Sequence, residues 1–196
     1  MTIPPIGIPS SLNSPMPEMK LRRAWLADVA EITTLVRSAY ARHVPRIGRE
    51  PMPMTADYGA AVRAHQVWVQ DAADGIVAVL ELIPAVDHLL VENIAVRPAL
   101  QGKGIGRGLM AFAEREAHRQ GLPEMRLFTN ARMFENIALY TRLGFHETGR
   151  EAFKDSVLVH MAKRLAPVTT RDRIIAGVAW LKTLGRGPRV RSFRSG

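Results

Sequence analysis

Residues 96–106 read VRPALQGKGIG and connect a β-branched, apolar run to a segment with helical spacing. The apolar run ends at Pro98, and glycines at positions 102, 104, 106 and 108 lead into the helical segment. Because glycine has no Cβ, its backbone can approach an anion closely, and the free amides and positive dipole of a helix N-terminus point toward such an anion. The stretch predicts a strand, a phosphate-binding turn and a helix; a tight turn without a ligand is the alternative.

Two familiar phosphate-binding motifs do not fit this turn. The dinucleotide fingerprint requires a parallel βαβ unit, whereas the segments before this turn have the pattern of antiparallel strands. The phosphate loop of NTPases requires Gly-Lys-Ser/Thr, and here Lys103 is followed by Gly104. The sequence therefore does not predict either kind of nucleotide site.

The surrounding sequence alternates between strand and helix patterns. Alternating or β-branched runs predict strands at residues 21–25, 67–69, 76–80, 89–96, 125–129, 145–150 and 157–163. Helical spacing predicts helices at residues 28–39, 55–64, from the glycine turn to Gly121, and at 133–143. The proline-containing segment 42–53 is predicted to be a loop, and a loop of this length in a compact domain is often functional.

Length and composition indicate one domain. The chain has 196 residues, of which 47% are hydrophobic, enough for a single well-buried core. Residues 1–18 contain five prolines and no apolar period, so they are predicted to be a disordered leader before a domain at 19–165. The sequence contains no apolar run of membrane-spanning length and no export signal, which predicts a cytoplasmic protein without a transmembrane segment.

Charge and cysteine content restrict the chemistry. The formal charge is +9, but residues 166–196 carry seven Lys/Arg against one Asp, a net of +6, which leaves +3 for the rest of the chain. This balance suits a phosphate-bearing ligand as well as a polymer. The chain has no cysteine, which excludes disulfides and thiolate nucleophiles, and its histidines lack the spacing of a helical metal pair, so no metal is predicted.

The stretch 96–106 resembles the acyl-CoA signature of the GNAT superfamily of N-acetyltransferases. A second block, residues 136–145, reads NIALYTRLGF and is similar to a later helix and strand of the same family. The resemblance covers residues 21–165. It implies an α/β fold with a single mixed, mostly antiparallel sheet that is splayed between its fourth and fifth strands and flanked by helices.

The resemblance also implies a site for acetyl-CoA as the acyl donor. The strand before the turn would hydrogen-bond the pantetheine arm, which Asn136 would also contact. The glycine turn would bind the pyrophosphate. The implied donor-binding residues are Ile94, Ala95, Val96, Gln101, Gly102, Lys103, Gly104, Ile105, Gly106 and Asn136. Lys103 would add charge, although a lysine in a glycine turn is nearly as often solvated.

Acyl transfer from a thioester requires a neutral amine, stabilisation of an oxyanion and a proton for the departing thiolate. Tyr140 lies one helical turn after Asn136 and is expected to supply that proton; packing under Phe145 is the alternative. The oxyanion donor would be a backbone amide near Ile94. Glu92 shares a strand face with Ile94 and is the leading candidate for the base, although a carboxylate that satisfies a β-bulge is equally consistent. Weaker candidates are Glu81 and His88, and water could replace a dedicated base.

The acceptor is expected to be a small-molecule or peptide amine that binds near residues 43–54. Arg46, Arg49 and Tyr58 could receive a carboxylate of the acceptor, although arginines on a loop more often face solvent. The class of amine stays open, because a fold does not determine a substrate.

Two other functions compete with acetyl transfer. The first is a catalytically silent GNAT fold that binds acyl-CoA as a sensor or regulator. The second is nucleic-acid binding through the basic extension 166–196, which lacks interleaved aromatics and any recognisable reading motif. That extension could equally pack on the domain, form a homodimer interface or contact an anionic membrane surface.

Overall fold

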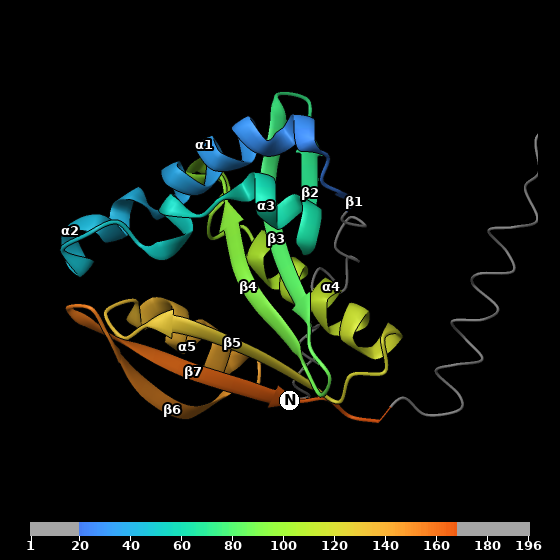
Figure 1. The fold of residues 1–196 in the computed structure, drawn as a ribbon, viewed down its shortest axis with the longest axis vertical. Helices are drawn as coiled ribbons and strands as arrows, with labels where there is room; N and C mark the ends of the chain where they lie inside the picture. Colours follow the sequence, from blue (N-terminus) through green and yellow to red (C-terminus); the bar gives the residue numbers. More distant parts are fainter. Residues whose placement is uncertain (1–19, 168–196) are drawn as a thin grey trace, which may run out of the picture.

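The computed structural model describes residues 20–167, which form a seven-stranded sheet with the order β1-β2-β3-β4-β5-β7-β6 (Figure 1). The strands are β1 (Leu21–Arg23), β2 (Gln66–Ala72), β3 (Gly75–Pro84), β4 (Leu89–Val96), β5 (Glu124–Asn130), β6 (His146–Phe153) and β7 (Ser156–Arg164). The main helices are α1 (Val29–Tyr40), α3 (Tyr58–Ala64), α4 (Ile105–Arg119) and α5 (Phe134–Arg142). The predicted leader at 1–18 and nearly all of the basic extension lie outside the described residues.

The sheet is antiparallel except where β4 meets β5. These two strands pair in parallel only at Leu89–Met125, Leu90–Arg126 and Val91–Leu127, all at the beginning of β4. Beyond that point β5, β7 and β6 diverge from β2, β3 and β4, so the two halves of the sheet form a V in Figure 1. The predicted mixed α/β sheet, splayed between its fourth and fifth strands, is confirmed.

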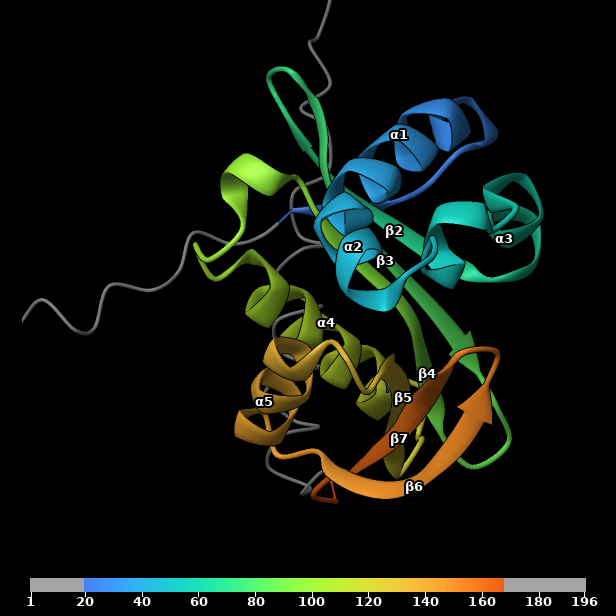
Figure 2. The same cartoon turned by 90° about the vertical axis from the view of Figure 1, so that its left-hand side faces the viewer.

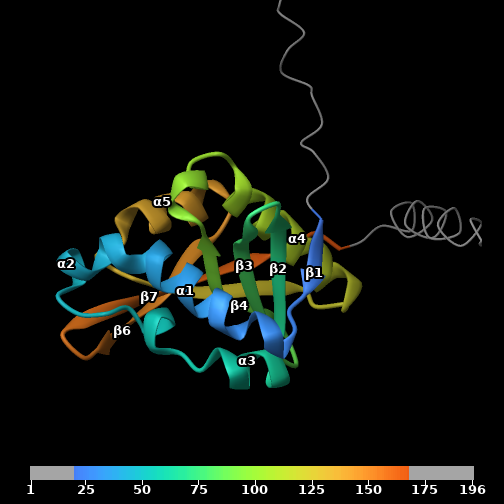
Figure 3. The same ribbon diagram turned by 90° about the horizontal axis from the view of Figure 1, so that it is seen from above.

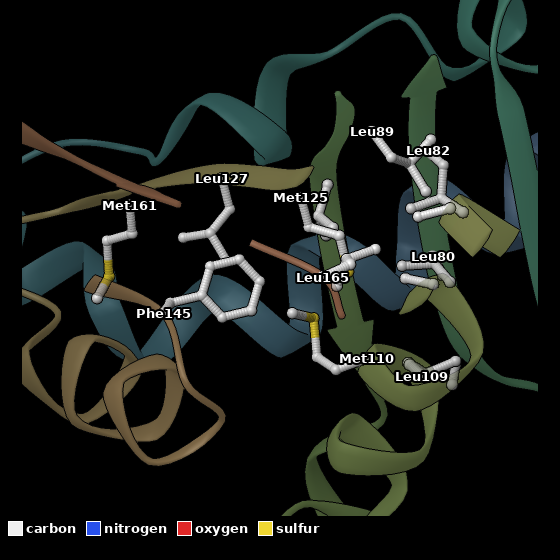
Figure 4. Close-up of a cluster of buried hydrophobic side chains, with 14 of the residues drawn as sticks. Leu80, Leu82, Leu89, Leu109, Met110, Met125, Leu127, Phe145, Met161 and Leu165 are labelled. Carbon is white, nitrogen blue, oxygen red and sulfur yellow. The ribbon is translucent and has the colours of Figure 1, made fainter. Parts of the chain in front are cut away.

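Helices cover both faces of the sheet. Helices α1 and α3 lie on one face, and α4 and α5 lie on the other (Figures 2 and 3). Residues such as Ile32, Val36 and Val69 form the core under α1, whereas Leu80, Leu109 and Met161 belong to the larger core under α4 and α5 (Figure 4). Both cores are apolar because each helix buries one stripe against the sheet.

The segment predicted to be a loop at 42–53 contains short helices, so that prediction was wrong in part. They are η3 (Ala41–His43), α2 (Val44–Ile47) and η4 (Met52–Thr55). Prolines stand in the first turn of α2 and of η4, where a fixed φ favours a helix start and no donor is lost. Gly48, with φ of 84°, ends α2 in the left-handed region. The segment is therefore a folded wall.

No helix between residues 20 and 167 is both long enough and apolar enough to cross a bilayer.

Candidate functional site

The gap between β4 and β5 begins at a β-bulge. Glu81 pairs with Asn93 and Leu82 pairs with Val91, so Glu92 is the extra residue on β4. A bulge bends its strand, and this one lies where β4 and β5 stop pairing. The bulge that the sequence offered as an alternative explanation of Glu92 is present, and it places Glu92 at the mouth of the gap.

The backbone of β4 presents polar groups to this gap. The amide of Arg97 donates to the carbonyl of Val77 on β3 (2.9 Å). Because hydrogen-bonding direction alternates along an antiparallel strand, the peptide groups of Ile94 and Val96 point away from β3. Their carbonyls accept hydrogen bonds from the Tyr40 hydroxyl (3.3 Å) and from Gln101 Nε2 (2.9 Å), respectively. The backbone of Ile94 and Val96 therefore faces the gap, whereas Ala95 pairs with β3.

The glycine turn forms an open cradle at the N-terminus of α4. Gly102 and Gly104 have φ values of 76° and 88°, a left-handed conformation that favours glycine. Gly104 is the N-cap residue, and no side chain caps the helix. A Cβ added at Gly106 would have no atom within 4 Å, so that position borders empty space. The first amides of a 15-residue helix are thus directed at an accessible volume.

A groove of about 1310 Å³ runs from this cradle to the gap. Its lining includes Ala95 and Val96 of β4, the turn residues except Lys103, and three arginines, Arg42, Arg107 and Arg142. Lys103 does not line the groove, whereas these three arginines do and place positive charge along it. Open glycines, a free helix N-terminus and nearby arginines fit the pyrophosphate of CoA.

A second cavity lies on the other side of the gap. It is bounded by residues 47–53, β4, β5 and the end of β6, and its wall is mostly apolar. It shares with the groove the residues Tyr40, Ile94, Met133, Asn136 and Tyr140. The gap therefore connects a groove beside the cradle with a separate chamber, called the acceptor chamber below.

Tyr140 and Asn136 lie on the shared wall, one turn apart on α5 as the sequence predicts. The Tyr140 ring lies 6.0 Å from that of Phe145 in an edge-on arrangement, so it packs as well as lining both cavities. Among residues 20–167 no group hydrogen-bonds its hydroxyl. Burial raises the pKa of Tyr140 to about 12, which keeps the phenol protonated at neutral pH.

Of the three carboxylate and histidine candidates for a base, only Glu92 lines the acceptor chamber. Burial raises the pKa of Glu92, and the negative charge of Glu81 raises it further. Glu81 itself is 4% exposed and its Oε1 lies 2.6 Å from His65 Nδ1. His88 pairs with Asp87 in the β3–β4 turn, outside the cavities described here.

Sequence reasoning missed a buried network behind Glu92. The Tyr40 hydroxyl donates to Asn93 Oδ1 (2.8 Å), and Asn93 Nδ2 donates to the Tyr58 hydroxyl (3.0 Å). Tyr58 in turn donates to the carbonyl of Pro53 (2.8 Å). The network joins α1, β4 and the wall segment 47–55. The asparagine that follows Glu92 in a mostly apolar strand was the sequence signal for this network.

The three acceptor candidates lie in different places. Arg46 pairs with Glu135 (2.6 Å) and stacks on Phe134, outside the acceptor chamber. Arg49 lines the chamber. Tyr58 lines a third cavity of about 740 Å³, which also contains Glu81 and Glu92. Only Arg49 of the three borders the space next to the gap.

Residues 63–147 match the family model described as "Acetyltransferase (GNAT) domain". This match includes β4, the glycine turn and α5, which carry the geometry above. This region is a GNAT domain. Among curated GNAT relatives, rat N-acetyltransferase family 8 member 3 is 30% identical over 88 residues, 42% of this chain and 39% of that protein. The chain spans at most about two fifths of the length of the curated relatives that it matches.

Solved GNAT structures share the fold. The ribosomal-protein-S18-alanine N-acetyltransferase of Escherichia coli superposes with a TM-score of 0.62 at 20% identity, covering 77% of this chain and 96% of that one. The PaiA N-acetyltransferase of Thermoplasma acidophilum, solved in complex with coenzyme A, gives 0.63 at 14% identity, covering 74% and 98%. At these identities the likeness establishes the fold, and function has to be argued from the site.

Proposed function

We propose that this GNAT protein transfers an acetyl group from acetyl-CoA to a primary amine by direct attack in a ternary complex. The observation that carries the proposal is the connection through the β4–β5 gap between the cradle groove and the acceptor chamber. Two substrates can therefore approach the same point from opposite sides. A covalent thiol intermediate on the protein has no candidate, because the chain has no cysteine.

The donor side is expected to use backbone groups more than side chains. The N-terminal amides of α4, around Gly104 to Gly106, would bind the pyrophosphate, with Arg42, Arg107 and Arg142 contributing positive charge. The gap-facing peptide groups of Ile94 and Val96 would hydrogen-bond the pantetheine arm. Asn136 would contact the same arm from α5.

The chemistry at the gap requires three tasks from the protein. Acetyl-CoA supplies a thioester carbonyl at which a neutral amine forms a C–N bond as the C–S bond breaks. Glu92 would accept the proton that the amine loses, and its raised pKa brings it closer to neutral pH, as general bases require. The amide of Ile94 would stabilise the negative charge that develops on the carbonyl oxygen.

Tyr140 would stabilise the departing sulfur by a hydrogen bond. A thiol with an ordinary pKa of about 8.5 is a stronger acid than a phenol with a pKa of about 12. Complete proton transfer from Tyr140 to the thiolate is therefore unfavourable, whereas donation of a hydrogen bond to the developing charge is not. CoA would leave as a thiolate that takes its proton from solvent.

The test measures binding and turnover separately. Acetyl-CoA at saturation should raise the unfolding midpoint, since a ligand at about 100 times its Kd stabilises the native state by about 2.7 kcal/mol. Release of free CoA thiol is then followed with a panel of primary amines. A midpoint shift with no CoA release from any amine would refute acetyl transfer and favour the silent acyl-CoA-binding alternative. Absence of both signals would remove the donor assignment as well.

A further inference from the structure

Arg49 is the arginine of the acceptor chamber, and it lacks an acidic partner among residues 20–167. Its Nη1 donates only to the carbonyl of the adjacent Glu50 (3.3 Å). Its Nε is fully buried and has no hydrogen-bond acceptor in the described part of the chain. A buried donor without an acceptor is costly, and more so when the group is charged. The neighbouring carboxylate cannot help, because Glu50 pairs with Arg37 (2.5 Å).

The position of Arg49 is held by packing. The guanidinium lies over the ring of Phe153, 5.3 Å from its centroid, at the end of β6. Residues on either side belong to the folded wall between α2 and η4. Arg132, in the connection between β5 and α5, holds that wall by donating to the carbonyl of Ile47 (2.7 Å). Arg49 is therefore presented to the chamber by a fixed wall, unlike the solvated loop arginine that the sequence alone favoured.

Charges of opposite sign reach the chamber from different walls. Glu92 projects from β4 beside the gap, where the reacting amine has to lie, and Arg49 comes from the segment between α2 and η4. Much of the remaining lining is apolar, including Ile47, Phe128 and Leu158. A molecule with an amine at one point, an anion at another and an apolar group between them matches this distribution.

We propose that Arg49 forms a carboxylate subsite, so the acceptor is a small amine that also carries a carboxylate and an apolar side chain, as a free apolar amino acid does. This inference rests on the proposed acetyl transfer. Guanidinium binds a carboxylate through two parallel hydrogen bonds, and such a pair made by the Nη groups of Arg49 would orient the amine toward the gap.

The test compares matched acceptors that differ only in the charged group. Leucine, methionine and phenylalanine are each assayed beside their carboxamides, which keep the size and the amine but remove the negative charge. The variants are Arg49→Gln, which removes the charge, Arg49→Lys, which keeps a charge without the fork geometry, and the control Arg150→Gln. Arg150 is exposed on β6 and lies outside the cavities described here.

The wild type should prefer at least one free amino acid over its carboxamide. Arg49→Gln should reduce kcat/KM for that amino acid by about 10- to 100-fold, mainly through KM, because a hydrogen bond to a charged group has this value. The same variant should leave the carboxamide nearly unchanged, Arg49→Lys should recover part of the loss, and Arg150→Gln should behave as the wild type. Circular dichroism and thermal unfolding verify that each variant folds.

Calorimetry in the presence of CoA gives a readout that does not need turnover. Binding of the free amino acid should weaken by about 10- to 100-fold in Arg49→Gln, while binding of the carboxamide is the same in both proteins. Acetylation of amino acids and carboxamides at equal rates in the wild type, or equal binding before and after the substitution, would overturn the carboxylate subsite and leave acetyl transfer standing. Carboxylate-dependent binding through Arg49 without any CoA release would instead support the subsite and refute the proposed transfer.

Discussion

Replacement of Tyr140 by phenylalanine separates a catalytic hydroxyl from a packing ring. The substitution keeps the edge-on contact with Phe145 and removes only the oxygen. No described residue hydrogen-bonds that hydroxyl, so no partner is left unsatisfied. We expect the free energy of unfolding to change by less than about 0.5 kcal/mol.

Turnover should suffer much more than stability. Loss of one positioned donor to a developing negative charge commonly reduces kcat by about 10²- to 10³-fold. Since the pKa of Tyr140 is about 12, the wild-type phenol stays protonated from about pH 6 to pH 10. The ratio of wild-type to variant kcat should therefore be constant over this range, and the KM for acetyl-CoA should change little.

Tyr40→Phe provides the matched contrast. Tyr40 lines the same gap, but its hydroxyl donates to the buried Asn93 Oδ1, and that oxygen would lose its partner. We expect a loss of about 1–3 kcal/mol in unfolding free energy for Tyr40→Phe and almost none for Tyr140→Phe.

The assay is CoA release at saturating acetyl-CoA, with single-turnover measurements to ensure that chemistry limits the rate. Equal single-turnover rates for wild type and Tyr140→Phe across the pH range would show that Tyr140 acts only in packing.

Three further substitutions test the rest of the site. Glu92→Gln should lower kcat/KM and abolish the rise of kcat/KM with pH, because the wild-type carboxylate forms only as pH increases through its raised pKa. If kcat/KM of the variant still rises with pH as in the wild type, Glu92 is not the base. The folded carboxyl also holds its proton more tightly than the unfolded one, so its stabilising contribution is present at low pH and lost as pH rises. Urea unfolding should therefore show Glu92→Gln gaining stability over wild type as pH rises above about 4, the ordinary pKa of an unfolded glutamate. Gly106→Glu should abolish the rise in melting temperature that acetyl-CoA induces, because position 106 borders the open space of the groove, while the circular dichroism spectrum stays native. Gly106→Ala is the milder control, and an unchanged thermal shift in Gly106→Glu would place the pyrophosphate elsewhere. Asn93→Ala should cost about 2–4 kcal/mol in urea unfolding, because the Tyr40 and Tyr58 hydroxyls each lose one of their two hydrogen-bond partners and the buried amide is removed. Asn136→Ala should cost far less, since the Asn136 side chain makes no hydrogen bond within residues 20–167; similar losses for both would contradict the role assigned to the network.

Local sequence patterns determined the secondary structure of this protein and the position of its cradle. Alternating or β-branched runs predicted every strand, and the helix period of 3.6 predicted the four main helices, because each of these patterns is set by near neighbours in the sequence. Glycines at 102, 104 and 106 predicted the cradle, since left-handed backbone and open space next to a helix N-terminus select that residue locally. Tyr140 and Asn136 could be placed on one face for the same reason.

Only the tertiary structure decided how distant segments meet. The bulge at Glu92 depends on the register between β3 and β4, and the gap depends on where β4 and β5 stop pairing; neither leaves a local period. Tyr40 is 53 residues from Asn93 in the sequence, and the hydrogen bond between them exists only after α1 packs on the sheet. The sequence alone favours a solvated loop arginine at position 49, whereas in the fold the wall segment places Arg49 in the lining of the chamber. Sequence determined which elements form, because that choice depends on near neighbours, and the fold determined which side chains share the gap, because that choice depends on packing between residues far apart in the chain.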